Sequence, residues 1–269
     1  MTLFWLLAII YLVIFITLGV VYYVHYKFNY WDRAIMPFKP CPFYQGDYDF
    51  REMKILGTRE DRIGIFSYSL YGNYKRYCPT LYKSIDNQKS LMPKWQARVY
   101  IASDSTKEVR KELLLRGAEL IIMGPNPPKG HEGALWRFLA LEKSDKMPFV
   151  CLDADDIFDQ SVVNKIKAWQ ESGQTFCSWF PIVLAIPMTA GYWGCKGYSV
   201  PDIKSRIAKY CEHCYGFDEM FLKKEIWPLA EEKGCWFPWY ARADLLFPYI
   251  YFFLIILMIV SLYLAWRNC

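Results

Sequence analysis

The stretch PFVCLDADD, residues 148–156, places three carboxylates directly behind a short apolar strand, Phe149–Leu152. Such an apolar run is typical of a buried strand in a parallel sheet, where ligands bind beyond the carboxyl ends. The carboxylates of Asp153, Asp155 and Asp156 would repel one another, and raise one another's pKa, unless a cation neutralised them. A divalent ion with oxygen ligands, Mg²⁺ or Mn²⁺, does this and can also hold a diphosphate. The stretch therefore predicts a metal site formed by Asp153 and Asp155.

The chain before this stretch alternates strands and helices. We expect strands at Ile63–Phe66, Ala97–Ile101 and Ala118–Met123, and helices at Tyr74–Leu91, Lys107–Arg116 and Ala134–Glu142. Ser105 is expected to cap the second helix, and Gly117 to close it. This alternation is typical of an α/β domain in which helices cover both faces of a mostly parallel sheet.

A second polar segment follows a strand in the same way. Ser67, Tyr68 and Ser69 come directly after the first expected strand. In open α/β sheets, ligands bind outside the carboxyl ends of strands, at a switch in strand order. We therefore expect this segment and the acidic cluster to lie at one site, unless Ser67–Ser69 form only an ordinary strand–loop turn.

Two other interpretations of the acidic cluster remain open. One is a solvated loop whose aspartates cap a helix that begins near Asp159. The other is a phosphatase of the haloacid dehalogenase type, in which the first aspartate is the nucleophile. That motif normally lies on the first strand of the fold, and Asp155-Asp156-Ile157 fits its continuation only loosely. Here three strand–helix units precede the motif, an order that favours a nucleotide-sugar transferase.

Several short motifs occur in a familiar order. They are FSYSLYG (66–72), PKWQARVYIASD (93–104), LLLRGAELI (113–121), GALWRFLALEK (133–143), PFVCLDADD, GYWGCKG (191–197) and YGFDEMFLKKEIWP (215–228). Together they resemble a family of small GT-A-fold glycosyltransferases from large DNA viruses and bacteria, over about residues 61–230. The family's usual continuation is D-A-D-S-R preceded by Arg, whereas this chain has Leu152 before the motif and Asp156-Ile157 after it.

The resemblance implies roles on the donor side of the site. Ser67–Ser69 would form the nucleotide-binding loop, with Tyr68 stacked on the base of a UDP- or GDP-sugar. Arg137 would bind phosphate through bidentate hydrogen bonds. The alternative for Arg137 is a structural salt bridge to Asp155 or Asp156.

It also implies roles on the acceptor side. Asp218 or Glu219 would take the proton of the acceptor hydroxyl, as an inverting enzyme requires; alternatively, Asp218 only favours the start of a helix. Gly191, Trp193 and Gly194 would form a loop close to the sugar, with Trp193 as a stacking face, or else a simple turn. The acceptor would be a glycan, a lipid or a protein. A catalytically inactive transferase fold that serves as a membrane scaffold is a further alternative.

Both ends of the chain carry long uncharged segments, Leu3–Tyr23 and Leu245–Ala265. About 20 apolar helical residues cross a bilayer, so each end is expected to span one. The expected organisation is a transmembrane anchor at 1–26, a connector at 27–60, a GT-A-like domain at 61–240 and a second transmembrane helix at 245–265. Basic residues lie on the domain side of both spans, and the positive-inside rule then places the domain in the cytoplasm of a two-pass membrane protein.

Composition limits the remaining possibilities. The 269 residues include 54% apolar types and carry a formal net charge of +5. The basic residues are scattered, which indicates no nucleic-acid partner. The nine cysteines have no regular spacing. Cys211-Glu212-His213-Cys214 could form half of a zinc site, completed by Cys195 or Cys235, but free thiols are the simpler expectation.

Overall fold

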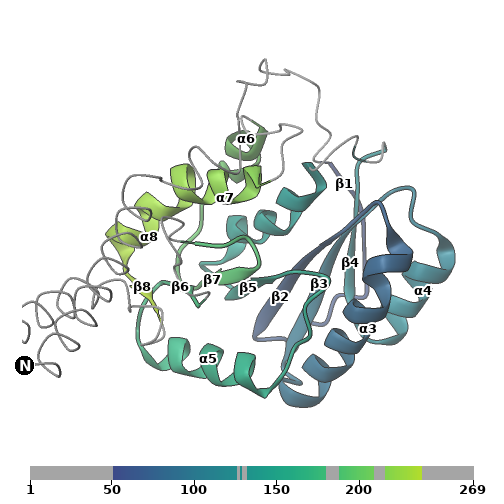
Figure 1. The fold of residues 1–269 in the computed structure, drawn as a ribbon, viewed down its shortest axis with the longest axis horizontal. Coiled ribbons are helices and arrows are strands. Elements are labelled where there is room, and N and C mark those ends of the chain that lie inside the picture. Colours follow the sequence, from purple (N-terminus) through teal and green to yellow (C-terminus); the bar gives the residue numbers. More distant parts are fainter. Residues whose placement is uncertain (1–50, 126–127, 129–131, 180–187, 209–215, 238–269) are drawn as a thin grey trace, which may run out of the picture. The chain divides into compact units, whose positions relative to one another are not determined.

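The computed structural model describes residues 51–125, 128, 132–179, 188–208 and 216–237. They belong to one unit formed by residues 40–180 and 187–238. One eight-stranded sheet runs through the described residues, with the strand order β1-β4-β3-β2-β5-β7-β6-β8 (Figure 1). The strands are β1 (Glu52–Leu56), β2 (Gly64–Leu70), β3 (Trp95–Ala102), β4 (Glu119–Met123), β5 (Phe149–Leu152), β6 (Phe176–Ser178), β7 (Tyr192–Cys195) and β8 (Cys235–Trp236).

The centre of the sheet is parallel and its margins are mixed. Strands β4, β3, β2 and β5 pair in parallel, which confirms the predicted α/β class. Strand β1 is antiparallel to β4, and β7 is antiparallel to both of its neighbours, β5 and β6. Strand β1 lies in the range expected to be a connector, so that part of the chain contributes an edge strand to the sheet.

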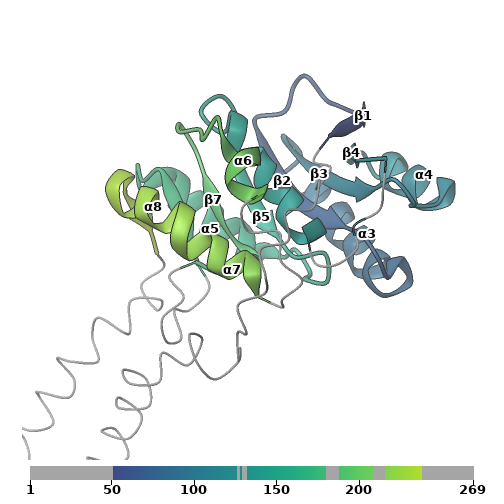
Figure 2. The ribbon, with the colours of Figure 1, turned by 90° about the horizontal axis from the view of Figure 1, so that it is seen from above.

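Helices cover both faces of this sheet, as expected (Figures 1 and 2). Helices α3 (Tyr74–Leu91), α4 (Lys107–Leu115) and α5 (Gln160–Glu171) contribute buried side chains to one apolar cluster. The opposite cluster includes side chains from the 3₁₀ helix η1 (Glu132–Lys143), α6 (Ile203–Ala208), α7 (Phe217–Phe221), the π-helical turn η2 (Leu222–Ile226) and α8 (Trp227–Lys233). The helix predicted at 134–142 is a 3₁₀ helix.

Strand β2 continues past its predicted end at Phe66. The hydroxyl of Ser67 donates to the carbonyl of Arg137 at 2.6 Å, and that of Ser69 donates to the carbonyl of Ala134 at 3.3 Å. Because η1 satisfies both hydroxyls, polar side chains can stay in a buried strand without an unpaired donor. The strand consequently ends at Leu70.

Helix ends follow the local capping rules with one correction. Thr106, not Ser105, caps α4, because its hydroxyl accepts a hydrogen bond from the amide of Val109 at 3.3 Å. Gly117 follows that helix with a φ of +88°, as a closing glycine should. Asp159 caps α5 through the amide of Val162 at 3.1 Å.

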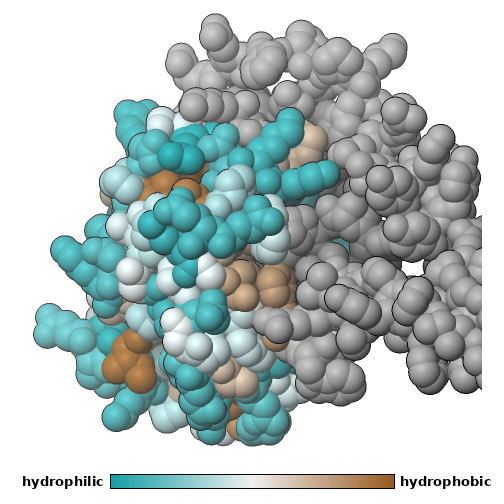
Figure 3. Space-filling view, turned by 90° about the vertical axis from the view of Figure 1, so that its left-hand side faces the viewer, coloured by the Kyte–Doolittle hydropathy of each residue, from teal (hydrophilic) through white to brown (hydrophobic). Residues whose placement is uncertain are grey.

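The described residues on the side of the molecule drawn in Figure 3 are mainly hydrophilic, with small hydrophobic areas between them. Among the described residues, the exposed large hydrophobic side chains are spread over β1, the ends of α3 and α4, and two loops: Met53, Ile55, Ile63, Leu91, Leu115 and Ile157. Exposures of this scattered kind are normal for a folded protein.

Among the described residues, no helix is both long and apolar enough to cross a membrane. The two predicted spans, most of the connector and Cys211–Cys214 lie outside the residues that the structure describes.

Candidate active site

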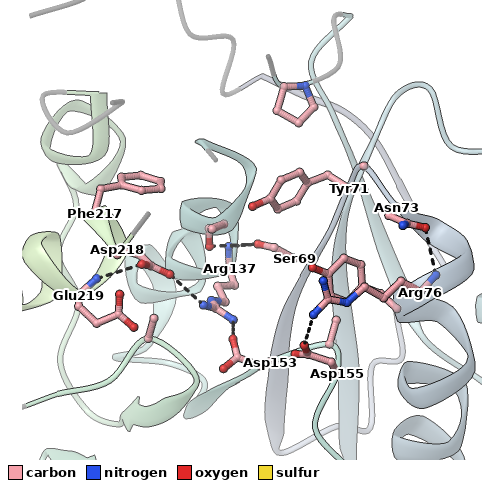
Figure 4. A pocket seen from close by; sticks show the side chains of 17 residues that line it. Ser69, Tyr71, Asn73, Arg76, Arg137, Asp153, Asp155, Phe217, Asp218 and Glu219 are labelled. Atoms are coloured by element: carbon pink, nitrogen blue, oxygen red, sulfur yellow. Dashed lines mark hydrogen bonds and ion pairs between the residues drawn. The ribbon is translucent and has the colours of Figure 1, made fainter. Parts of the chain in front are cut away.

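The chain reverses its direction of winding between β2 and β5. It passes from β2 outward to β3 and β4, and then returns to form β5 on the other side of β2. A crevice forms outside the carboxyl ends at such a switch point. Here a cleft of about 690 Å³ is lined by the end of β2 and the start of α3, the residues after β5, and the start of α7 (Figure 4). The predicted site residues Ser69, Arg137, Asp153, Asp155, Asp218 and Glu219 all line this cleft.

Arg137 joins two carboxylates from distant parts of the chain (Figure 4). Its Nη1 donates to Asp153, and its Nη2 donates to Asp218 at 3.3 Å. The residue is only 5% exposed. Burial by itself would lower the pKa of Arg137, but the charges of Asp153 and Asp218 outweigh it, and the pKa is raised. Arg137 does form a salt bridge, therefore, but with Asp153 and Asp218 rather than with the expected Asp155 or Asp156.

The three clustered aspartates face different surroundings. Asp153 and Asp155 line the cleft, and Asp155 lies 3.9 Å from the guanidinium of Arg76. Asp156 instead accepts a hydrogen bond from the hydroxyl of Tyr192. Burial is the main cause that raises the pKa of Asp156, and the charges of Asp153 and Asp155 add to it. Of the three clustered carboxylates, those of Asp153 and Asp155 face the cleft.

The donor set suits a hard divalent cation. Within the described residues, no group of three or more His, Cys, Asp or Glu side chains converges on one point. Mg²⁺ is commonly held by one or two carboxylates, with water and substrate phosphates as its other ligands. Asp153 and Asp155 supply two such carboxylates at an open cleft large enough for a nucleotide, so these residues fit Mg²⁺ or Mn²⁺.

Asp218 and Glu219 lie in the first turn of α7, after Gly216. The φ of Gly216 is +80°, which favours glycine at this position. Asp218 accepts hydrogen bonds from Arg137 and from the amide of Glu219. Burial, together with the hydrogen bond to Asp218 and the charge of Asp218, raises the pKa of Glu219 to about 9. Two adjacent carboxyl groups thus share the cleft, and burial together with Asp218 favours the protonated form of Glu219.

Tyr68 has a different position from the one predicted. Successive side chains of a strand point to opposite faces. Ser67 and Ser69 therefore face η1, whereas Tyr68 is fully buried in the opposite cluster, where it contacts Gln88 of α3. Tyr68 is consequently unable to stack on a nucleotide base in the cleft.

Trp193 is also misassigned by the sequence pattern. It is fully buried in β7, where its ring packs edge-on against Phe138 and Phe149 at centroid distances of 5.4 and 5.2 Å. It offers no face to a sugar. A Cβ on Gly194 would lie 2.4 Å from the carbonyl oxygen of Phe149, so this glycine permits close strand packing. Gly191, by contrast, approaches the carboxylate of Asp153 itself.

The sequence analysis missed the residues that follow β2. Tyr71, Asn73, Arg76 and Tyr77 line the cleft, and Asn73 caps α3 there. The ring of Tyr71 lies above Gly133, where a Cβ would come within 2.7 Å of the ring, and 6.0 Å from the ring of Trp136. The motif FSYSLYG already contains Tyr71; a correct prediction of the end of β2 would have identified it.

No protein-family model matches the chain, and no curated protein sequence matches it. Solved structures are similar to it, including the following two. One is a glucosyl-3-phosphoglycerate synthase of M. tuberculosis, with 16% identity and a TM-score of 0.36 over 51% of this chain and 58% of that one. The other is a mannosyltransferase from Pyrobaculum calidifontis in complex with GDP-Man and Mn²⁺, with 15% identity and a TM-score of 0.37 over 70% of this chain and 55% of that one. The chain thus spans a little over half the length of each. At this level of similarity, an assignment of activity rests on the chain's own residues.

Proposed function

We propose that the protein is a glycosyltransferase that moves a sugar from a nucleoside-diphosphate-sugar to an acceptor, with Mg²⁺ or Mn²⁺ held by Asp153 and Asp155. One observation carries this proposal. Two carboxylates suited to a metal–diphosphate complex, and a second carboxyl pair suited to proton transfer, line the same cleft at a topological switch point.

The donor nucleotide would bind on the β2–α3 side of the cleft. We assign base stacking to Tyr71, in place of the buried Tyr68, because the Tyr71 ring is partly exposed and lines the cleft. Arg76 is largely exposed and lies 3.9 Å from Asp155. Its charge would therefore lie close to a diphosphate held at Asp155, and would favour binding of the anion.

The remaining residues account for the transfer step. The acceptor hydroxyl oxygen forms a bond to the anomeric carbon of the sugar, and the bond from that carbon to the diphosphate oxygen breaks. A bound divalent ion would stabilise the negative charge that develops on the departing diphosphate. The proton of the hydroxyl would pass to Asp218, which lines the same cleft, because burial and Asp218 favour the protonated form of Glu219. Arg137 holds Asp218 in place through a hydrogen bond of 3.3 Å.

The membrane assignment remains part of the proposal. The uncharged segments Leu3–Tyr23 and Leu245–Ala265 support a two-pass protein, and the basic flanks support a cytoplasmic catalytic domain. A domain held at a bilayer at both ends would act on a glycan, lipid or protein acceptor close to that bilayer.

Ligand-induced stabilisation tests the proposed activity directly. The full chain in detergent would be heated with a panel of UDP- and GDP-sugars, each with and without Mn²⁺. A ligand that binds only the folded state raises the midpoint of unfolding. We expect stabilisation by at least one nucleotide-sugar that is lost on chelation. Stabilisation by phosphate analogues alone would favour the phosphatase of the dehalogenase type, and no response to metal would favour the inactive scaffold.

A further inference from the structure

We propose that Arg137 is a positioning residue that couples the metal pair of the donor side to Asp218 of the acceptor side. This inference rests on the proposed function, because it takes Asp153 as a metal ligand. It adds a role for a side chain that need not touch either substrate. The charge of Asp218, which is not itself assigned to the metal, should determine through Arg137 how strongly the cleft holds a divalent cation.

The contacts of Arg137 define this coupling. One guanidinium nitrogen, Nη1, bonds to Asp153 and to the carbonyl oxygen of Leu152 at 3.2 Å. The other, Nη2, bonds to Asp218 at 3.3 Å. The side chains of Asp153 and Asp218 are 37% and 15% exposed, whereas that of Arg137 is 6% exposed. The buried guanidinium of Arg137 is thus shared between two carboxylates, of which that of Asp153 is the more exposed to solvent.

The backbone around Arg137 holds the guanidinium at this position. The amide of Arg137 donates to the hydroxyl of Ser69 at 3.0 Å, and its carbonyl accepts from Ser67 at 2.6 Å. Its neighbours Leu135, Trp136 and Phe138 are buried in the apolar cluster under the sheet. Because the backbone is anchored and the side chain is buried, the guanidinium is limited to small shifts between the two carboxylates that it already contacts.

Competition for Asp153 follows from this geometry. A divalent cation at Asp153 has to share that carboxylate with Arg137 or displace the guanidinium from it. Asp218 eases this step, since it offers the guanidinium a second anionic partner that is already in place. If Asp218 loses its charge, Arg137 has only Asp153 as an anionic partner, and the cation competes less well. Metal binding would in turn tighten the Arg137–Asp218 contact at the acceptor side.

A double-mutant cycle on Mn²⁺ affinity tests the coupling without any measurement of catalysis. The full chain in detergent, free of nucleotide, would be titrated with Mn²⁺ at neutral pH, and free Mn²⁺ measured by electron paramagnetic resonance. The variants are Arg137→Met, Asp218→Asn and the double variant. Asp202→Asn is the matched control, since it makes the same charge change at a residue that pairs with Arg206 instead.

We expect Arg137→Met to bind Mn²⁺ more tightly than the parent, because a competing cation is removed. Asp218→Asn should bind about 3- to 10-fold more weakly, in the range of coupling between directly contacting charged residues. In the Arg137→Met background, the same Asp218→Asn change should have little effect. Asp202→Asn should match the parent. A purely structural role for Arg137 would not produce tighter binding on its removal.

Two results would overturn the inference. One is an equal loss of affinity from Asp218→Asn in both backgrounds, which would indicate a simple through-space charge effect. The other is weaker Mn²⁺ binding by Arg137→Met while its unfolding midpoint stays near that of the parent. If Arg137→Met does not fold, Arg137→Lys takes its place, since a single ammonium cannot span both carboxylates in the way the planar fork does. Failure of the parent chain to bind Mn²⁺ would sink the proposed metal site itself, a result distinct from failure of the cycle.

Discussion

Gly191 lies directly against the carboxylate of Asp153: a Cβ at this position would be 1.9 Å from Oδ2 and 2.5 Å from Cγ. The φ of Gly191 is not in the left-handed region, so alanine would meet no backbone strain there. The requirement for glycine is therefore steric, and it concerns the orientation of one proposed metal ligand.

Gly191→Ala should consequently reduce Mn²⁺ affinity and the rate of sugar transfer, while the unfolding midpoint of the apo protein stays near that of the parent. The added methyl group has to push the Asp153 carboxylate, a side chain that is 37% exposed and able to rotate. Gly194→Ala is the contrasting variant, because its Cβ would meet the Phe149 backbone oxygen at 2.4 Å. The main effect of Gly194→Ala should therefore be a lower unfolding midpoint. Equal metal affinity in the parent and Gly191→Ala would contradict the assignment of Asp153.

Asp155→Asn should abolish the stabilisation that Mn²⁺ and a nucleotide-sugar give together, while the fold of the apo protein is kept. The Asp155 side chain is 50% exposed and makes one long ion pair with Arg76, so its loss removes little structure. Calorimetric or fluorescence melting curves with and without metal measure both quantities. Retained turnover by Asp153→Asn or by Asp155→Asn, in samples chelated and then re-metallated, would refute the metal pair.

Tyr71→Ala should weaken binding of the donor nucleotide by about 5- to 150-fold, since base–aromatic stacking contributes roughly 1–3 kcal/mol. Tyr71→Phe keeps the ring and should bind nearly as well as the parent. Tyr68→Ala is the comparison at the position that sequence alone favoured; it empties a fully buried site and should lower stability instead. Nucleotide affinity measured by isothermal titration separates the two tyrosines. Unchanged affinity in Tyr71→Ala would place the base elsewhere.

Glu219→Gln should change how stability depends on pH. The pKa of Glu219 is raised to about 9 in the folded chain, from a reference value of 4.5. Between these values the unfolded chain has released the proton that the native state keeps, so stability falls as pH rises through this window. Glutamine carries no such proton. The unfolding midpoint of Glu219→Gln relative to the parent should therefore increase from pH 5 to pH 9, with chelator present throughout. A constant difference across that range would exclude the raised pKa.

Membrane topology is testable at the far end of the chain. If both uncharged segments span the bilayer and the domain is cytoplasmic, Cys269 lies on the opposite side from the domain. Membrane-impermeant thiol reagents should then label Cys269 in intact membranes only from the non-cytoplasmic side. A variant with Cys269 as its single cysteine avoids background from other thiols. Labelling from the cytoplasmic side alone would overturn the predicted orientation.

Features that depend on neighbouring residues were predictable. The strand Phe149–Leu152 and the helix Tyr74–Leu91 have the predicted bounds. Helix α5 begins near Asp159, as predicted, and Asp159 caps it. Apolar runs, helical spacing and capping residues act over a few positions, so the linear order of amino acids is sufficient to reveal them. For the same reason the acidic residues after β5 could be placed at the end of a strand.

The direction in which each side chain points was not predictable in the same way. The position at which a strand ends decides which side chains belong to it. Within the strand, successive side chains point to opposite faces, so an error of one or two residues in the predicted end misplaces them. Strand β2 extends to Leu70 because Ser67 and Ser69 bond to carbonyls of η1, which lie 70 and 65 positions further along the chain. That long-range pairing buries Tyr68 and leaves Tyr71 in the cleft.

The partners of Arg137 belong to the same category. The residue pairs with Asp153 and Asp218, which are 16 and 81 positions away. The sequence indicated an arginine near the acidic cluster, but its choice of carboxylate depends on how η1, β5 and α7 pack around one cleft. Local pattern thus specifies which residues are available for chemistry, whereas contacts between distant segments determine which of them meet, because the free energy of those contacts is set by packing in three dimensions.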